Sequence, residues 1–504
     1  MLASIPSATL LGARGHRVHV EVHVAQGLPT FTVVGLPDET VREARDRVRA
    51  AVQSSELPWP QQRITVNLAP GGLRKAGAGL DLPIAVGVLV AVGALAAEAI
   101  AGHAFVGELG LDGSVRRVPG MVPLAGAVEE PTVVVPAECA HEAAIVAEGR
   151  VRGVPTLRSL VEALTAEAPW PTVADPPATP DDGPTPDLAD VRGHGFARRA
   201  LEVAAAGGHH LLMVGPPGSG KTMLAQRLPG LLPPLDGSTA LEVTMLHSAA
   251  GVALPPGGLI TRPPLRQPHH TSSVVAVVGG GTSGLRPGEA SLSHGGVLFM
   301  DELGEFHADV LDGLREPLEA GVVHVTRARA AVTFPARFVL VAAMNPCPCG
   351  LATQPGACSC PPAARARYLQ RVSGPIFDRF DLRLGINRPS VDELLDVPRG
   401  EPTAVAAARV AAARVLAVER SGALNATVAS AQLDEVAPLD RAATAVLRRE
   451  LEVGRLTGRG LARVRRVART VADLDGRSGR LEEDDIQQAL QLRGDPLDLA
   501  RRVA

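Results

Sequence analysis

An eight-residue stretch, Gly215 to Thr222, contains the residue types that bind nucleotide phosphates. It reads GPPGSGKT and fits the pattern G-x-x-x-x-G-K-[ST] in full, between an apolar segment, HHLLMVG, and a helix-forming one. Glycines let backbone N–H groups close around phosphate oxygens, Lys221 would reach the β- and γ-phosphates, and Thr222 would bind Mg²⁺. We therefore predict that ATP and Mg²⁺ bind through Gly215, Pro216, Pro217, Gly218, Ser219, Gly220, Lys221 and Thr222.

Polar side chains end two further apolar segments. The segment VLFMDE ends in Asp301 and Glu302, and RFVLVAAMN ends in Asn345. Asp301 suits a role in the Mg²⁺ shell, and Glu302 suits a base that orients water. The Asn345 amide could position water near the γ-phosphate. Acidic strand ends are common, so these assignments depend on the phosphate loop beside them.

Four of the five cysteines lie within 14 residues that begin just after Asn345. Their spacing, C-x-C-x8-C-x-C, offers four soft ligands that suit tetrahedral Zn²⁺. Reduced structural thiols, a redox switch and an iron–sulfur centre are the alternatives. We expect a cluster that braces the loop beside the nucleotide, and we expect the fifth cysteine, Cys139, in a core. The proposed ligands are Cys347, Cys349, Cys358 and Cys360.

The elements that must position these residues divide the chain into four parts. Residues 1–166 mix alternating strand patterns with helical ones, which predicts an α+β domain. Residues 167–188 form a linker rich in proline and aspartate. Residues 189–390 alternate strands, loops and helices, and their apolar strands are typical of a buried parallel sheet in an α/β core. Residues 391–504 have helical patterns throughout.

Composition excludes several classes of protein. With 46% hydrophobic and 20% charged residues and a net charge of −3, the chain is globular and is not coated with phosphate-binding charge. The longest apolar run, residues 82–97, contains Pro83 and is short for a membrane span of about 20 residues, so we expect a buried helix and no membrane partner. The N-terminus lacks the pattern of a signal peptide, and cysteines are few, which predicts a cytoplasmic protein.

The stretch from Arg266 to Gly350, which runs from RQPHHTSSVVAVVGGG to MNPCPCG, resembles the YifB/ComM family of magnesium-chelatase-like AAA+ ATPases. The resemblance covers essentially the whole chain and implies a C-terminal helical lid and a homo-oligomeric ring, usually a hexamer, with ATP at subunit interfaces. It also implies an arginine delivered to the neighbouring subunit, which matches Arg379, with Arg383 as the alternative. The nucleotide-sensing arginine of the lid matches Arg459, or Arg463 next.

The N-terminal part resembles the Lon-protease fold through RITVNLAPGGLRKAGAGLDLPIA and FVGELGLDGSVRRVPG. A Lon-type peptidase needs a serine that is activated by a lysine. The serine position falls at Gly79 and the lysine position near Val122, while Lys75 has no serine close to it in the sequence. We therefore expect a binding or assembly module without peptidase activity.

The resemblance implies an ATP-driven ring motor acting on DNA, a branch-migration helicase or translocase of homologous recombination or natural transformation. The alternatives are the ATPase subunit of a metal-chelatase-like complex and a protein-remodelling ATPase with an inactive Lon-like domain. Two segments, 262–284 and 321–334, are expected to form hairpins at the pore of the ring. There Arg266, Arg327 and Arg329 could contact a phosphate backbone without reading sequence.

Overall fold

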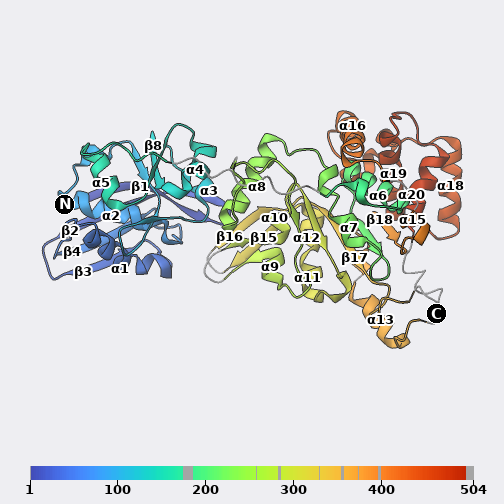
Figure 1. The fold of residues 1–504 in the computed structure, drawn as a ribbon, viewed down its shortest axis with the longest axis horizontal. Coiled ribbons are helices and arrows are strands. Elements are labelled where there is room, and N and C mark those ends of the chain that lie inside the picture. Colours follow the sequence, from blue (N-terminus) through green and yellow to red (C-terminus); the bar gives the residue numbers. More distant parts are fainter. Residues whose placement is uncertain are drawn as a thin grey trace.

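Three parts follow one another along the long axis of the molecule in the computed structural model (Figure 1). Strands and helices of the N-terminal part lie at one end, a parallel sheet occupies the middle, and the C-terminal helices form the other end. The structure describes residues 2–173, 186–256, 258–281, 285–327, 330–352, 357–372, 374–395 and 399–494. Most of the predicted linker, residues 174–185, and Arg329 of the predicted pore hairpin lie outside these ranges.

The N-terminal part contains a mixed sheet and a smaller parallel one. The first has the order β1-β2-β4-β3, with β3 and β4 parallel and the other pairs antiparallel. The second has the order β5-β8-β9. Strands and helices are both present in this part, as predicted. The elements are β1 (Leu2–Leu11), β2 (Arg14–Ala25), β3 (Thr30–Val34), β4 (Arg63–Ala69), β5 (His103–Phe105), β6 (Glu108–Leu109), β7 (Val115–Arg116), β8 (Thr132–Pro136), β9 (Val151–Val154), α1 (Glu39–Ser54), α2 (Asp81–Ala91), α3 (Met121–Gly126), α4 (Ala140–Ala147) and α5 (Leu157–Leu164).

Helix α2 confirms the expectation for the longest apolar run. All of its residues are buried between the strands and helices of the N-terminal part. A helix that is apolar on every side is stable in water only when neighbours cover it all round. None of the helices within the described ranges combines the length and apolarity that a membrane crossing needs.

The middle part is an α/β core built on a parallel sheet. Its strand order is β11-β14-β17-β10-β18, and every neighbouring pair is parallel. Side chains of the central strands are buried on both faces, as the continuous apolar runs predicted. The strands are β10 (Leu211–Val214), β11 (Leu265–Arg266), β14 (Val297–Met300), β17 (Val339–Met344) and β18 (Leu382–Gly385), and the helices are α6 (Gly195–Gly207), α7 (Lys221–Ala225), α8 (Gly237–Ala250), α9 (Val274–Val278), α10 (Glu289–Leu292), α11 (Ala308–Gly313), α12 (Arg315–Ala320), α13 (Pro362–Arg371) and α14 (Gly374–Phe377).

The two segments expected to form hairpins differ. The second is the antiparallel hairpin of β15 (Val322–Arg327) and β16 (Ala330–Pro335), as predicted. The first supplies β11 to the main sheet and then helix α9, and only β12 (Gly279–Gly280) forms a short ladder, with β13 (Arg286–Pro287). The expectation of hairpins within 262–284 is therefore met only at its end, where β12 pairs with β13, because the start of the segment joins the main sheet and its middle forms α9.

The β15–β16 hairpin packs against the N-terminal part. A Cβ atom added at Gly12, in the turn between β1 and β2, would lie 2.3 Å from Cγ1 of Val332. Gly12 also has a φ of +65°, which disfavours a side chain. The glycine thus permits close contact between the turn and the hairpin.

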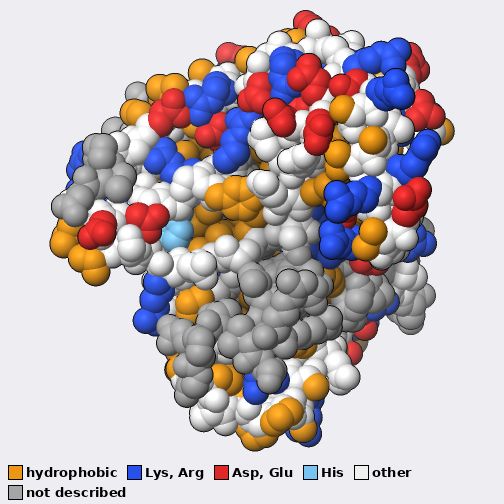
Figure 2. Space-filling model, turned by 90° about the vertical axis from the view of Figure 1, so that its right-hand side faces the viewer, with side chains coloured by type: hydrophobic (Ala, Val, Ile, Leu, Met, Phe, Trp, Pro, Cys, Tyr) orange, Lys and Arg blue, Asp and Glu red, His pale blue; other side chains and the backbone are white. Residues whose placement is uncertain are grey.

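The C-terminal helices pack around α6 of the core. This part is helical, as the patterns in residues 391–504 predicted. Its helices are α15 (Val391–Leu395), α16 (Thr403–Ser421), α17 (Leu433–Val436), α18 (Arg441–Glu452), α19 (Gly458–Leu474) and α20 (Glu483–Gln491). Buried Asn425 donates to Asp473, which also accepts two hydrogen bonds from Arg420. Figure 2, which looks at this end of the molecule, shows cationic and anionic side chains interspersed over its upper part.

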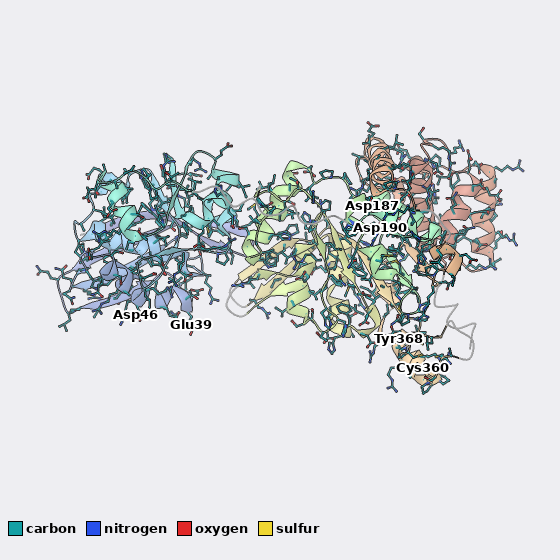
Figure 3. The ribbon with its side chains drawn as sticks, viewed as in Figure 1. Glu39, Asp46, Asp187, Asp190, Cys360 and Tyr368 are labelled. Atoms are coloured by element: carbon teal, nitrogen blue, oxygen red, sulfur yellow. The ribbon has the colours of Figure 1, made fainter. Side chains whose placement is uncertain are left out.

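Asp187 fastens the start of the core to two other segments. Its carboxylate Oδ1 accepts hydrogen bonds from the backbone N–H and the hydroxyl of Thr403, at 2.7 and 2.8 Å. Its carbonyl oxygen accepts one of 2.8 Å from Arg227, in the turn that follows α7. Figure 3 shows Asp187 and Asp190 together beside the C-terminal helices.

Candidate nucleotide-binding site

The predicted site residues follow three neighbouring strands of the parallel sheet. The phosphate loop follows β10, Asn345 follows β17 and Asp301 follows β14, and these strands pair in the order β14-β17-β10. The carboxyl ends of parallel strands meet at one edge, where open α/β sheets bind their ligands. The backbone N–H of Gly215 donates to the carbonyl of Met344 at 3.2 Å, which joins the loop to the end of β17.

The phosphate loop has the backbone geometry that its glycines allow. Gly218 and Gly220 have φ angles of +75° and +82°, which only glycine adopts readily. At Gly215, an added Cβ would lie 2.1 Å from the carbonyl oxygen of Ile386. Arg388, which the sequence did not single out, donates from Nη2 to the Pro217 carbonyl at 2.9 Å. The segment that follows strand β18 therefore also contacts the phosphate loop and fixes its position.

Lys221 lies inside the loop and contacts Asn345. Its Nζ donates to the carbonyls of Gly215 and Pro216, at 2.7 and 2.9 Å, and lies 3.4 Å from Oδ1 of Asn345. Burial lowers the pKa of Lys221, and Asp301 and Glu302 oppose that shift. The ammonium is thus placed at the centre of the predicted phosphate site.

Thr222 and Asp301 meet as the prediction of a shared Mg²⁺ requires. The Thr222 hydroxyl donates to Oδ2 of Asp301 at 2.8 Å. The other carboxylate oxygen of Asp301 accepts from the backbone N–H of Glu302 at 3.0 Å. A hydroxyl and a carboxylate at this distance are the hard oxygen ligands that Mg²⁺ prefers.

Glu302 has a partner that the sequence analysis missed. Oε2 of Glu302 lies 3.1 Å from Nδ1 of His270, and Glu302 itself has a φ of +54°, which is uncommon outside glycine. The His270 ring also lies against that of His269, with the ring centroids 4.2 Å apart and the rings tilted by 33°. The two adjacent histidines in RQPHHTSS were a signal of a possible site in the sequence. The sequence does not show, however, that folding brings this segment to the end of β14, where Glu302 lies.

The two predicted arginines lie near each other. Arg379 forms an ion pair with Glu319 of α12. Burial lowers the pKa of Arg379, and the charges of Arg463 and Arg459 lower it further, so these guanidinium groups are neighbours. Arg459 is exposed at the start of α19. Within the described part of the chain, neither Arg379 nor Arg459 is bonded to the phosphate loop, Asp301 or Glu302.

The alternative arginines, Arg383 and Arg463, both interact with other residues of the same chain. Arg383 donates to the Phe377 carbonyl at 3.1 Å, and its guanidinium lies 4.1 Å from the centroid of the Phe377 ring. Arg463 lies 3.5 Å from buried Asp381. Arg266 of the expected pore segment makes two hydrogen bonds to Glu289, of 2.6 and 2.8 Å. Glu289 therefore holds the Arg266 guanidinium within the chain, and contact of Arg266 with a phosphate backbone stays a prediction.

The four clustered cysteines meet directly beside the phosphate loop. Their sulfur atoms all lie within 4.8 Å of one another. The turn that carries the first two contacts the loop, because a Cβ added at Gly350 would lie 2.4 Å from Cδ of Pro217. Cys139 is buried in the N-terminal part, as expected. The cysteine cluster therefore lies in contact with the phosphate loop, the position from which it could stabilise the conformation of that loop.

A cavity of about 720 Å³ separates part of the N-terminal domain from the core. Gly79, the position that matches the Lon-type serine, lies in its wall. The lining found among the described residues includes neither serine nor lysine. Val122 is buried, and Nζ of buried Lys75 donates to the Pro70 carbonyl while burial lowers its pKa. The serine and lysine of a Lon-type peptidase therefore do not meet at this wall within the described residues.

Family models and individual proteins both match this chain. The model described as "Magnesium chelatase, subunit ChlI" matches residues 187–394, and two related models match residues 20–139 and 400–493. The competence protein ComM of Haemophilus influenzae is 41% identical over 482 residues, 94% of each chain. YifB of Escherichia coli is 41% identical over 499 residues, 98% of this chain and 97% of its own. A protein of Mycobacterium tuberculosis is 44% identical over 497 residues, 97% of each chain.

Proposed function

Because the chain belongs to the YifB/ComM family of magnesium-chelatase-like proteins, we propose that it is an ATP-hydrolysing AAA+ motor that acts on DNA. The proposed reaction is hydrolysis of ATP with Mg²⁺, coupled to movement along or branch migration of DNA. The physiological setting would be homologous recombination or natural transformation, in line with the printed name of the Haemophilus relative.

The observation that carries the ATPase proposal is the meeting of five side chains at one sheet edge. Lys221 would neutralise the β- and γ-phosphates, and Thr222 and Asp301 would hold Mg²⁺. Glu302 would orient the attacking water, and Asn345 would position that water and the γ-phosphate. These residues come from three segments, which follow β10, β14 and β17, and this is why a chance glycine-rich turn does not account for the arrangement.

Assembly into a ring, which we propose is hexameric, accounts for the position of Arg379. Its side chain is 29% exposed and pairs with Glu319, and among the described residues it makes no hydrogen bond or ion pair with the phosphate loop of its own subunit. In a ring it would reach the nucleotide of the next subunit and neutralise the charge that develops on the transferred phosphoryl group. Arg459, exposed on the helical part, would sense the same nucleotide when that part acts as a lid. Residues 1–166 would serve as a Lon-like binding or assembly module.

Three arginines support an anionic polymer as the partner. Arg74, Arg286 and Arg327 come from three separate segments and line the cavity beside the N-terminal part. All three are exposed, and none forms an ion pair with another residue in the described ranges. Unpaired guanidinium groups that converge from separate segments suit a phosphate backbone better than a base edge. We propose these arginines as DNA contacts.

The experiment is the rate of ATP hydrolysis without DNA, with single-stranded DNA, with duplex DNA and with a synthetic four-way junction, each at two salt concentrations. Stimulation that is strongest with branched DNA and weakened by salt supports the proposal. Glu302→Gln serves as the hydrolysis-deficient control, and Arg327→Ala should reduce stimulation while leaving the DNA-free rate unchanged. A flat response to every DNA contradicts the proposal.

The descriptions of the matching family models favour one further candidate, an ATPase subunit of a metal-insertion complex. Such a subunit would hydrolyse ATP without responding to DNA. A flat response to DNA combined with stimulation by a tetrapyrrole and its metal would favour this candidate. The four DNA reactions, together with one that contains the tetrapyrrole and its metal, therefore separate the two functions.

A further inference from the structure

The four clustered cysteines have the geometry of a site for a single metal ion. Sγ of Cys347 lies 3.4 Å from that of Cys349 and 3.7 Å from that of Cys358, and Cys349 and Cys358 are 3.6 Å apart. Cys360 lies within 4.8 Å of all three. A tetrahedral zinc ion, with Zn–S bonds of about 2.3 Å, holds its sulfur ligands roughly 3.8 Å apart. We propose that the chain binds one Zn²⁺ through these four thiolates and that the ion fixes the nucleotide site.

Other uses of four thiols fit the distances less well. A disulfide brings its sulfurs to about 2.05 Å, so these thiols are not paired with one another. An iron–sulfur cluster attaches its thiolates to different iron atoms, which sets the sulfurs farther apart than one shared ion does. Among the described residues, the group of candidate ligands consists of cysteines alone. A closed set of four thiolates is a typical structural zinc site.

The turn that carries Cys347 and Cys349 is shaped for thiolate ligands. The backbone N–H of Gly350 donates to the Cys347 carbonyl at 2.9 Å, and Gly350 has a φ of +78°. This turn brings the sulfurs of Cys347 and Cys349 to 3.4 Å from each other, as two ligands of one ion require.

Both ends of the cluster are tied to the nucleotide site. At one end, Asn345 lies two residues before Cys347, and the turn at Gly350 contacts Pro217 of the phosphate loop. At the other end, Cys360 leads into α13, as Figure 3 shows for Cys360 and Tyr368. The ring of Tyr368 packs against Gly304, just after Glu302.

One hydrogen bond strengthens the link through α13. Nη1 of Arg371 donates to the carbonyl of Gly304 at 3.3 Å. One ion that joins the Cys347–Cys349 turn to the segment before α13 thus fixes the phosphate loop, Asn345 and the backbone after Glu302 relative to one another.

The first experiment measures the metal directly. The full chain is purified under reducing conditions without added metal, and its zinc, iron and protein contents are determined. We expect one zinc per chain in the wild type and in Cys139→Ala, the control for an unrelated thiol. Cys358→Ser and Cys360→Ser should weaken zinc binding by more than about 100-fold, while Cys358→His, which restores a zinc ligand, should retain the ion. Wild-type chain without zinc, or with iron in its place, overturns the proposal.

The second experiment tests the link to the nucleotide and rests on the proposed ATPase activity. Zinc-free Cys358→Ser should retain nucleotide affinity within a few-fold, because Lys221 and the loop amides remain, but should lose at least about tenfold in kcat because Asn345 is no longer fixed. Cys358→His should recover turnover together with zinc. Equal kcat in zinc-bound and zinc-free protein overturns the link. The metal content does not depend on hydrolysis or DNA, so failure of the proposed function would leave the first result unchanged.

Discussion

The hydroxyl of Thr222 donates a 2.8 Å hydrogen bond to the carboxylate of Asp301, across 79 positions of sequence. This bond links the helix after the phosphate loop to the end of β14. When Mg²⁺ binds, both oxygens are in place to enter or support its coordination shell. The pair therefore offers a direct test of the proposed metal position.

Thr222→Val should reduce Mg²⁺-dependent hydrolysis by about 10- to 100-fold, because it removes the oxygen and keeps the shape of the side chain. Thr222→Ser, which keeps the hydroxyl, should remain within a few-fold of wild type. The measurement is the ATPase rate as a function of Mg²⁺ concentration. Equal losses in both variants would show that the methyl group, and not the hydroxyl, matters at this position.

His270→Gln should raise the hydrolysis rate without DNA by a few-fold and reduce the further stimulation by DNA. The reason is that Nδ1 of His270 lies 3.1 Å from Oε2 of Glu302, where it competes with water for the proposed base. His307→Gln, an exposed histidine near the same strand end, is the control. A DNA-free rate that falls in His270→Gln would instead mean that the histidine helps to orient Glu302.

Arg379→Ala should remain folded and bind ATP, yet lose about 10³-fold or more in turnover, the range expected for an arginine that stabilises a transferred phosphoryl group. Mixing it with Lys221→Ala subunits should restore part of the activity. The second variant lacks its own nucleotide site but carries an intact arginine, so mixed rings contain complete interfaces. Arg383→Ala is the control. No recovery on mixing would contradict delivery of Arg379 between subunits.

Acid should destabilise the core through His210. Its Nδ1 accepts the backbone N–H of Leu340 at 3.0 Å, which requires a neutral ring, and burial lowers the pKa of His210 from 6.5 to about 4. Between these pH values the unfolded chain binds a proton that the folded chain excludes, so the free energy of unfolding falls as the pH drops through this window, by on the order of 2 kcal/mol.

The measurement for His210 compares urea unfolding at pH 7 and pH 4.5. His210→Gln keeps an acceptor for the Leu340 N–H and removes the titration, so it should lose less stability than wild type over the same interval. The two proteins share every other titrating group, which cancels in the comparison. Parallel losses would assign the acid sensitivity to other residues.

Gly350→Ala should impair nucleotide binding. An added Cβ would lie 2.4 Å from Cδ of Pro217, and the φ of +78° adds a backbone cost. Gly422→Ala provides a matched control, because Gly422 has a φ of +70° and no atom within 4 Å of an added Cβ. We expect at least about tenfold weaker ATP affinity in Gly350→Ala alone. Similar affinities in the two variants would show that the phosphate loop adjusts to the methyl group.

Much of the core could be predicted because functional residues directly follow long apolar strands. The runs before Gly215, Asp301 and Asn345 became the parallel strands β10, β14 and β17. Strands β11 and β18 were not predicted. β11 has two residues and shows no periodicity, and β18 lies in a segment whose arginines and aspartates mask the apolar positions.

The missed contacts share a different cause. His270 beside Glu302 and Glu319 beside Arg379 join segments that no local pattern connects. Arg266 was expected in a pore, but a bidentate pair with Glu289 is a tertiary contact that spacing does not reveal. The cysteine spacing, by contrast, predicted the cluster, because four ligands within one short loop must lie close together.

The bonds of Asp187 have a mechanical consequence. This residue follows the predicted linker and is fastened both to Thr403, where α16 begins, and to Arg227, just after the helix of the phosphate loop. A load that reaches Asp187 from the N-terminal part would therefore act where the sheet meets the C-terminal helices. Such a load and nucleotide binding in the middle part would then act on the same residue.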